Sequence, residues 1–131
     1  MRLPDSYLHW DDAALAAVEI LRRAHDLVAF GWCQGADATD AEHHPVKPWS
    51  ERACHWSLLG ALSAALGTSQ QDMPESTARI AELRLALVAI SDLVPDWSLQ
   101  YWNDHPNRTQ SGVVHMLAAA HEHCRATTVA N

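Results

Sequence analysis

Hydrophobic positions recur at three- and four-residue spacing along most of the chain, as they do on one face of an α-helix. The first such stretch runs from about Asp11 to Phe30. Its apolar stripe, which is expected to face a core, consists of Ala14, Ala17, Val18, Leu21, Ala24, His25 and Val28. Asp11 and Asp12 supply a cap and negative charge at the start of this helix, and Gly31 ends it. We expect His25, at the edge of the stripe, to be a hydrogen-bonded structural residue.

A second helix is predicted from residue 51 to about residue 66, capped by Ser50 and closed by Gly67. Small residues lie along one side of it: Ala53, Ser57, Gly60, Ala61 and Ala64. A glycine inside a helix costs about 1 kcal/mol relative to alanine and usually has a packing reason. Gly60 therefore favours the close approach of a neighbouring backbone over a ligand groove.

A third helix is predicted from about residue 74 to residue 93, after a polar linker over residues 68–74. Pro74 suits its first turn, Pro95 follows its end, and Glu75 and Arg79 have the spacing of an i,i+4 ion pair. Its apolar stripe consists of Ile80, Leu83, Leu87 and Ile90.

Two more helices follow, one over residues 97–102 with Asp96 as its cap and one from residue 110 to about Arg125 with Thr109 as its cap. The inward positions of the last helix are Val113, Val114, Leu117, Ala120, His121 and Cys124. No alternating run is long enough to predict a strand. The predicted fold is an all-α, compact single-domain bundle of four to five helices over residues 1–131. Residues 1–10 are expected to be an N-terminal extension and residues 126–131 a frayed tail.

The segment GWCQGADATDAEHHPVKP breaks this helical pattern with two glycines, two prolines and three acids. It predicts one long ordered loop over about residues 31–49. Loops of this length are uncommon inside compact domains and often carry function, so the loop is the first place to expect a site.

Composition and charge narrow the classes of partner. A formal net charge of −7 does not favour binding to phosphate backbones or anionic lipid, and Arg22 with Arg23 is the only adjacent basic pair. The longest apolar stretches fall short of the roughly 20 residues that cross a bilayer. Three cysteines without a CxxC spacing suit a reducing compartment, and Pro4 among acids does not resemble a signal peptide. We expect a cytoplasmic protein without direct nucleic-acid or membrane binding.

Two sets of residues could carry chemistry. Cys33, His43, His44 and Cys54 are the ligand types that zinc prefers, although their spacing differs from that of familiar zinc modules. Cys54 with His55 and Asn103 has the composition of a thiol hydrolase triad. No nucleophile-elbow glycine pattern, phosphate-binding loop or HExxH is present, so catalysis is not favoured.

The stretch WNDHPNRTQ, residues 102–110, predicts a corner between the last two helices. Pro106 forces His105 away from helical angles and forms a turn with Asn107, while Asp104 and Arg108 can pair across the corner.

Asn103 is the residue of this corner whose amide still needs partners, because it has two donors and an acceptor to satisfy beside two aromatic residues. We expect it to pin the GWCQG loop, and its replacement by alanine to destabilise the fold by about 1–3 kcal/mol.

The motifs GWCQG, HWSLLGAL and YWND, followed by RT and VVHML, resemble those of a family of small uncharacterised proteins of bacterial and phage genomes. The resemblance covers roughly residues 14–120 and implies a single domain, with no activity known for the family. The matching positions are Trp32, Gln34, Trp56, Gly60, Trp102, Asn103, Asp104 and Thr109. In the family pattern a cysteine often follows the tryptophan of the second helix, whereas Ser57 follows Trp56 here, which puts a thiol mechanism shared by the family in doubt.

We therefore predict a non-catalytic, cytoplasmic protein-binding module without a cofactor, of the kind that a phage or mobile element uses to modulate a host protein. The predicted binding residues are Trp32, Gln34, Trp56, Trp102, Asn103, Asp104, Arg108 and Thr109. This hypothesis requires an exposed apolar patch that contains a tryptophan, since tryptophan is enriched at binding hot spots. The alternative is a small metal- or thiol-dependent enzyme that uses residues 31–55, with zinc as its metal.

Overall fold

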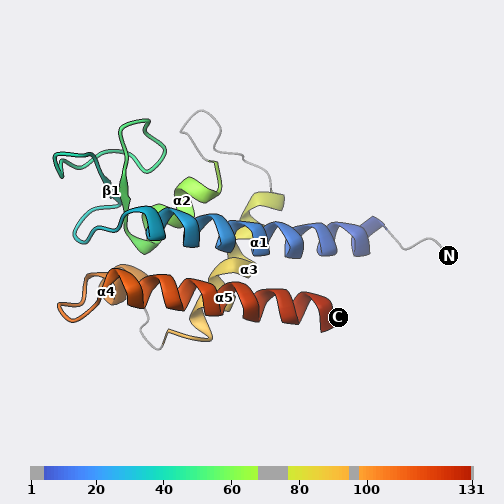
Figure 1. Ribbon diagram of the computed structural model, residues 1–131. Helices are drawn as coiled ribbons and strands as arrows, with labels where there is room; N and C mark the ends of the chain where they lie inside the picture. The colour runs from blue at the N-terminus through green and yellow to red at the C-terminus, as the bar shows by residue number, and fades with distance from the viewer. Residues whose placement is uncertain (1–4, 68–76, 95–97, 131) are drawn as a thin grey trace.

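The computed structural model describes residues 5–67, 77–94 and 98–130 of the chain (Figure 1). These residues form five helices and one small sheet. The elements are α1 (Asp5–Phe30), β1 (Ala38–Thr39), β2 (His55–Trp56), α2 (Leu58–Ala65), α3 (Thr77–Ser91), α4 (Leu99–Asp104) and α5 (Gln110–Ala130). The prediction of a mostly helical single domain is confirmed, with a short antiparallel pair of strands added to it.

The two long helices α1 and α5 run side by side in opposite directions, and α3 packs against both of them (Figure 1). α2 packs against α1. The sheet, α4 and the loops around them gather at the end of the bundle where α1 ends and α5 begins. Leu21, Leu58, Leu62, Ile90 and Leu117 are the largest apolar side chains buried completely in the core between these elements.

The first helix begins at Asp5, so residues 5–10 of the expected N-terminal extension belong to α1, and residues 1–4 lie outside the described residues. Asp11 and Asp12 lie inside the helix, so the predicted cap is wrong. Aspartate is a weak helix former but does not end a helix, so the helix extends past these residues toward the N-terminus. The predicted end is confirmed, as the Gly31 N–H bonds the Leu27 carbonyl at 3.0 Å. His25 is half-buried and lies 3.0 Å from an Asp26 carboxylate oxygen, as a hydrogen-bonded structural residue should.

The second helix begins later than predicted. Its cap is Ser57, whose hydroxyl accepts the Gly60 N–H at 3.1 Å, and residues 51–57 are turn and strand. The reason is long-range pairing: the Cys54 N–H bonds the Thr39 carbonyl at 2.9 Å, and the Trp56 N–H bonds the Gly31 carbonyl at 3.0 Å. A backbone that bonds two distant segments in this way cannot also be helical.

The close approach expected at Gly60 is confirmed, although the neighbour is a loop and not a helix. A β-carbon added at Gly60 would lie 1.7 Å from the Asp37 carbonyl oxygen. Gly67 ends the helix as predicted, with a φ of +69° that favours glycine.

The later helices follow the predicted order. α3 ends at Ser91. The described residues do not include the polar linker, Pro74, Glu75 or Pro95, and the side chain of Arg79 is not described, so the Glu75–Arg79 pair stays a prediction. α4 is capped by Ser98, whose hydroxyl accepts the Tyr101 N–H at 3.2 Å; the expected cap, Asp96, lies outside the described residues.

α5 begins where predicted, since the Thr109 hydroxyl accepts the Gly112 N–H at 3.0 Å. It continues to Ala130, so residues 126–130 of the predicted tail are helical, and residue 131 lies outside the described residues. Of its predicted inward positions, Val113, Leu117, Ala120 and Cys124 are buried and the other two are half-buried. Among the described residues, no helix has both the length and the apolar character needed to cross a membrane.

Candidate functional site

Asn103 joins three separate parts of the chain at the end of the bundle. Its side chain has no exposed surface. The amide oxygen accepts hydrogen bonds from the Trp32 indole at 2.8 Å and from the Leu58 N–H at 3.0 Å, while the amide nitrogen donates to the Cys33 carbonyl at 3.1 Å and to Asp104 at 2.9 Å. These four bonds use both lone pairs and both protons of the amide. The prediction that Asn103 pins the GWCQG loop is confirmed.

Two more contacts fix the same loop to the end of α4. Gln34 donates to the carbonyl oxygens of Asn103 and His105 at 3.0 and 2.9 Å, and the Gly35 N–H donates to the Asp104 carboxylate at 3.1 Å. Gly35 has a φ of +81°, which places its N–H toward the carboxylate in a conformation that other residues rarely adopt.

The Asp104 carboxylate is an acceptor at the centre of these contacts. Burial acts to raise its pKa, but hydrogen bonds from Asn103, Gln100 and Gly35 favour the charged form and together outweigh the burial, so the pKa is lowered. Asp104 is therefore ionised at neutral pH and serves as a structural acceptor.

The predicted ion pair between Asp104 and Arg108 is wrong. The Arg108 guanidinium lies 3.8 Å from the centre of the Trp102 ring and donates to the Trp102 carbonyl at 2.9 Å. Asp104 already accepts three hydrogen bonds from other residues, and the planar guanidinium stacks well on an indole. The other predicted features of the corner are confirmed: His105 has a ψ of 135°, and the Arg108 N–H closes the turn by bonding the His105 carbonyl.

The predicted binding residues thus meet mostly one another. Trp56 and Trp102 are buried and Trp32 is half-buried, and side-chain nitrogens of Trp32, Gln34, Trp56 and Arg108 donate to other parts of the chain. Their internal contacts explain why these residue types occur together. A role of this set in binding stays a prediction.

An open hollow of about 580 Å³ lies between α1 and α2. It is lined by Arg23, Asp26, Leu27, Phe30, Ala53, Trp56, Ala64 and Ala65. The Phe30 ring is 75% exposed and meets the edge of the Trp56 ring, with ring centres 6.3 Å apart. Trp56 is held in place by a 2.9 Å hydrogen bond from its indole to the Pro48 carbonyl. The hollow therefore has a buried aromatic residue, Trp56, in its wall and an exposed one, Phe30, at its lip. The exposed tryptophan that the sequence led us to expect is not part of it.

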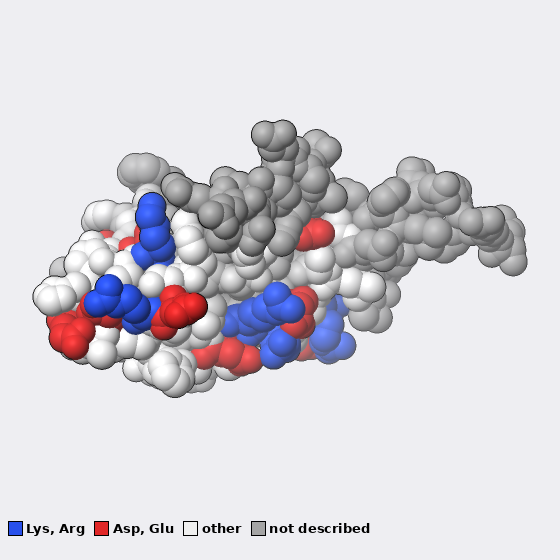
Figure 2. All heavy atoms as spheres, turned by 90° about the horizontal axis from the view of Figure 1, so that it is seen from above, with Lys and Arg blue, Asp and Glu red and all other residues white. Residues whose placement is uncertain are grey.

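Charged side chains surround the hollow without giving it one sign. Arg23 bonds Glu19 at 3.2 Å and reaches the Ala65 carbonyl at 3.5 Å, and Arg22 bonds both Glu19 and Asp26. Figure 2 shows basic and acidic side chains interspersed on one face of the molecule. A mixed surface of this kind is unlike the basic strip that binds nucleic acid.

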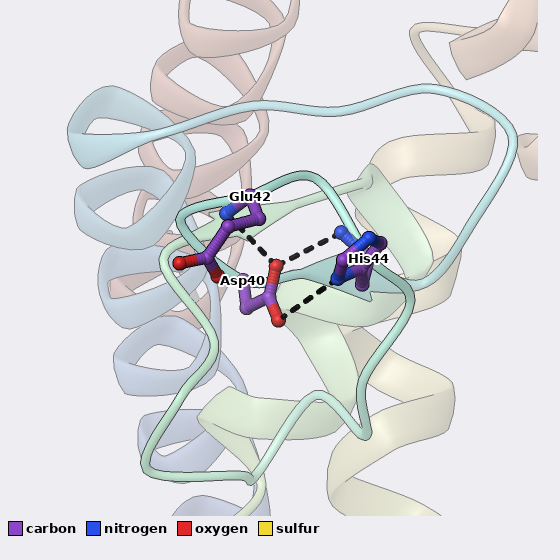
Figure 3. Close-up of side chains that lie close together, drawn as sticks. All are labelled: Asp40, Glu42 and His44. Carbon is purple, nitrogen blue, oxygen red and sulfur yellow. Dashed lines mark hydrogen bonds and ion pairs between the residues drawn. The ribbon is translucent and has the colours of Figure 1, made fainter.

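The predicted zinc ligands do not converge. Among the described residues, Asp40, Glu42 and His44 form the one group of three or more His, Cys, Asp and Glu residues whose possible ligand atoms all lie within 4.8 Å of one another (Figure 3). This group contains His44 but neither cysteine. Hydrogen bonds from the backbone of His44 and Glu42 to the Asp40 carboxylate lower the pKa of Asp40 and explain the geometry as a loop turn. The other two side chains are exposed.

The predicted thiol triad is assembled only in part. The Cys54 sulfur lies 3.7 Å from His55 Nδ1, but Asn103 bonds other residues. The Thr39 hydroxyl lies 2.9 Å from the same ring nitrogen, so it competes with the thiol, whereas the third member of a triad bonds the other ring nitrogen. The ring of His43 is stacked on that of His55, with ring centres 4.9 Å apart.

Residues 12–123 match a family of unknown function, DUF6197. The chain belongs to this family. No curated protein and no solved structure matches the chain. The expectation of an uncharacterised family is confirmed, and the matched span of this DUF6197 protein contains the corner, the hollow and the residues around His55.

Sequence reasoning missed the hollow of this DUF6197 protein. Its lip, Phe30, is the only phenylalanine of the chain and the last residue of α1, directly before the GWCQG loop. A large apolar residue at a helix end, outside the apolar stripe, was the available signal. Its partner Trp56 was singled out, but as part of a helix and not of a strand.

Proposed function

We propose that the protein is a non-catalytic binding module and that its hollow accepts an apolar helical segment of a partner protein. The observation that carries this proposal is the exposed Phe30 ring beside Trp56. Burying a phenylalanine completely stabilises a structure by about 1.5–3 kcal/mol, so a partner that covers Phe30 would gain from it. Aromatic residues in a fixed setting are typical centres of binding energy.

The chemistry of the hollow indicates what its occupant should present. The walls are mostly apolar, while Arg23 and Asp26 stand on the same side, three residues apart on α1. An amphipathic helix with an apolar side chain for the hollow, and with an acidic and a basic residue beside it, would complement both. The open shape favours such a helix over a small ligand, which normally needs to be enclosed.

None of the three cysteines is in a disulfide, which supports the proposal of a reducing, cytoplasmic setting. The resemblance to phage proteins extends the proposal to a modulator of a host protein. The alternative, an enzyme built on residues 31–55, has the contact between Cys54 and His55 in its favour. Against it, Thr39 competes with Cys54 for the same nitrogen of His55, whereas a triad needs its third member on the other nitrogen.

The size of the native complex tests the proposal. In extract of the cell that naturally makes the protein, the 14.5 kDa chain should elute from a sizing column in a larger complex, and the purified chain alone should elute as a monomer. Phe30→Asp should return the chain in extract to the monomer position. Ala64→Glu, which introduces a charge from the opposite wall, should do the same if Phe30→Asp proves unstable.

Tyr101→Asp is the matched control, because Tyr101 is 63% exposed on α4 and does not line the hollow. It should leave the complex intact. A monomer in extract of wild-type cells, or an equal loss of the complex in Tyr101→Asp, would count against the hollow as the binding surface.

A further inference from the structure

His55 contacts two other possible metal ligands: its Nδ1 lies 3.7 Å from the Cys54 sulfur, and its ring is stacked on that of His43. We infer that these three residues bind a thiophilic divalent metal ion such as Zn²⁺. None of these three residues lines the proposed hollow, so a test of one proposal does not decide the other.

Cys54 and His55 already have the separation of two ligands on one ion. Zinc binds a cysteine sulfur at about 2.3 Å and a histidine nitrogen at about 2.0–2.1 Å, and a tetrahedral angle between these bonds sets the two atoms about 3.6 Å apart. The observed distance from Cys54 Sγ to His55 Nδ1 is 3.7 Å. An ion can therefore bind both atoms with little movement of the backbone.

His43 is held beside this pair by the turn of its own loop. Its ring is stacked on His55 with an interplanar angle of 16°, and its backbone has a φ of +67°, which non-glycine residues adopt infrequently. The His43 N–H bonds the Asp40 carbonyl at 3.0 Å, and the Asp40 carboxylate bonds the next N–H, that of His44, at 2.9 Å. The ligand atoms of the three residues do not all lie within 4.8 Å of one another, so the inference requires the exposed His43 side chain to turn out of this stack to bring a nitrogen to the ion.

The groups next to Cys54 and His55 are compatible with a bound ion. Ion binding displaces the proton of the Cys54 thiol to solvent and occupies His55 Nδ1, the atom that Thr39 now contacts. The ion would replace the Thr39 hydroxyl as the partner of His55 Nδ1. Burial raises the pKa of Cys33, with the charges of Asp104 and Asp37 acting in the same direction, so Cys33 stays protonated and is a poor competing ligand.

The group of Asp40, Glu42 and His44 is the nearest competitor, and it suits a thiophilic ion less well. Two of its three ligands are carboxylates, which harder ions prefer. One of them, Asp40, already accepts two backbone hydrogen bonds. The two groups share no residue, so substitutions separate them.

Titration of the purified, untagged full chain with Co²⁺ tests the inference. Tetrahedral cobalt with a thiolate ligand gives a near-ultraviolet charge-transfer band and strong visible bands. We expect saturation at one ion per chain and displacement by Zn²⁺. Cys54→Ser should abolish the charge-transfer band, and His43→Ala should weaken Co²⁺ binding by at least the roughly 10–100-fold that is typical of losing an outer-shell partner.

His44→Ala and Cys124→Ser are the matched controls, since one changes the neighbouring histidine and the other a buried thiol of α5. Both should bind Co²⁺ like the wild type, and circular dichroism should show that every variant is folded. The inference is overturned if the wild type gives no charge-transfer band, if the band survives in Cys54→Ser or disappears in Cys33→Ser, or if His44→Ala weakens binding as much as His43→Ala.

Discussion

The amide oxygen of Asn103 lies 2.8 Å from the indole nitrogen of Trp32, 71 residues earlier in the chain. The same oxygen accepts the N–H of Leu58, the first residue of α2. One side chain therefore fixes the loop after α1, the start of α2 and the end of α4 relative to one another. Because Trp56 lies directly before the cap of α2, this arrangement also places the aromatic wall of the hollow.

Asn103→Ala should lower the free energy of unfolding by about 3 kcal/mol or more, because each buried partner left without a hydrogen bond costs about 1–3 kcal/mol. This is at or above the upper end of the range expected from the sequence. Urea denaturation followed by tryptophan fluorescence measures the change.

Two further substitutions test whether the lost hydrogen bonds of Asn103 cause this loss of stability. Asn103→Asp keeps the size of the side chain but removes the two donors and places a second carboxylate against Asp104, so it should be at least as destabilising as alanine. Asn107→Ala, in the exposed turn of the same corner, should change the stability by less than about 0.5 kcal/mol. A small effect of Asn103→Ala would contradict the structural role and favour ligand binding at the corner.

We expect the stability of the fold at acidic pH to depend in part on Asp104. Its pKa in the folded protein lies below the value of about 3.9 for an unfolded chain, so its hydrogen bonds stabilise the fold fully above that value. This contribution is lost as the pH falls through the lowered pKa. Asp104→Asn should therefore be less stable than the wild type at pH 7, and the difference should shrink on acidification to about pH 3. Unfolding midpoints in urea across this range measure it, and a difference that does not change with pH would be inconsistent with the assigned hydrogen bonds.

Gly60 should tolerate no side chain. An alanine there places a methyl group on the Asp37 carbonyl oxygen, and because both atoms belong to the backbone or are fixed to it, the loop must move. We expect a loss of about 3 kcal/mol or more. Gly112→Ala is the control, since its nearest contact is a side-chain oxygen at 3.3 Å and alanine favours the helix. Thermal unfolding of the two variants should show a large loss only for Gly60.

Arg108 should be sensitive even to lysine. The guanidinium plane stacks on Trp102 while donating to its carbonyl, and an ammonium group cannot do both. Arg108→Lys should cost about 1 kcal/mol of stability. Lys47→Arg, on an exposed residue near Trp49, is a control that should be close to neutral. Equal stability of Arg108→Lys and the wild type would show that the stack contributes little.

The sequence predicted those parts of the fold that depend on neighbouring residues. The spacing of apolar residues predicted the helices, and the turn chemistry of Pro106 and Thr109 predicted the corner. Asn103 was predicted to pin the GWCQG loop because an amide among aromatic residues needs partners.

The remaining features depend on contacts between distant residues. Ser50 and Ser57 are equally good caps by local rules, and only the pairing of residues 54–56 with the segments around Gly31 and Thr39 decides between them. Asp104 and Arg108 have opposite charges and suitable spacing, yet each is satisfied by a partner that local spacing does not show. The hollow and the contact between Cys54 and His55 are consequences of the same strand.

Site-specific photo-crosslinking from position 30 tests the proposed binding surface most directly. Benzoylphenylalanine replaces Phe30 in one variant and Tyr101 in a control, both produced in the native cell and irradiated there. Mass spectrometry should locate the crosslinks of the first variant in one amphipathic helical segment of one protein, with an acidic and a basic residue next to its apolar face. The control should not crosslink to that segment. Crosslinks scattered over abundant proteins, or equally frequent from both positions, would contradict the account.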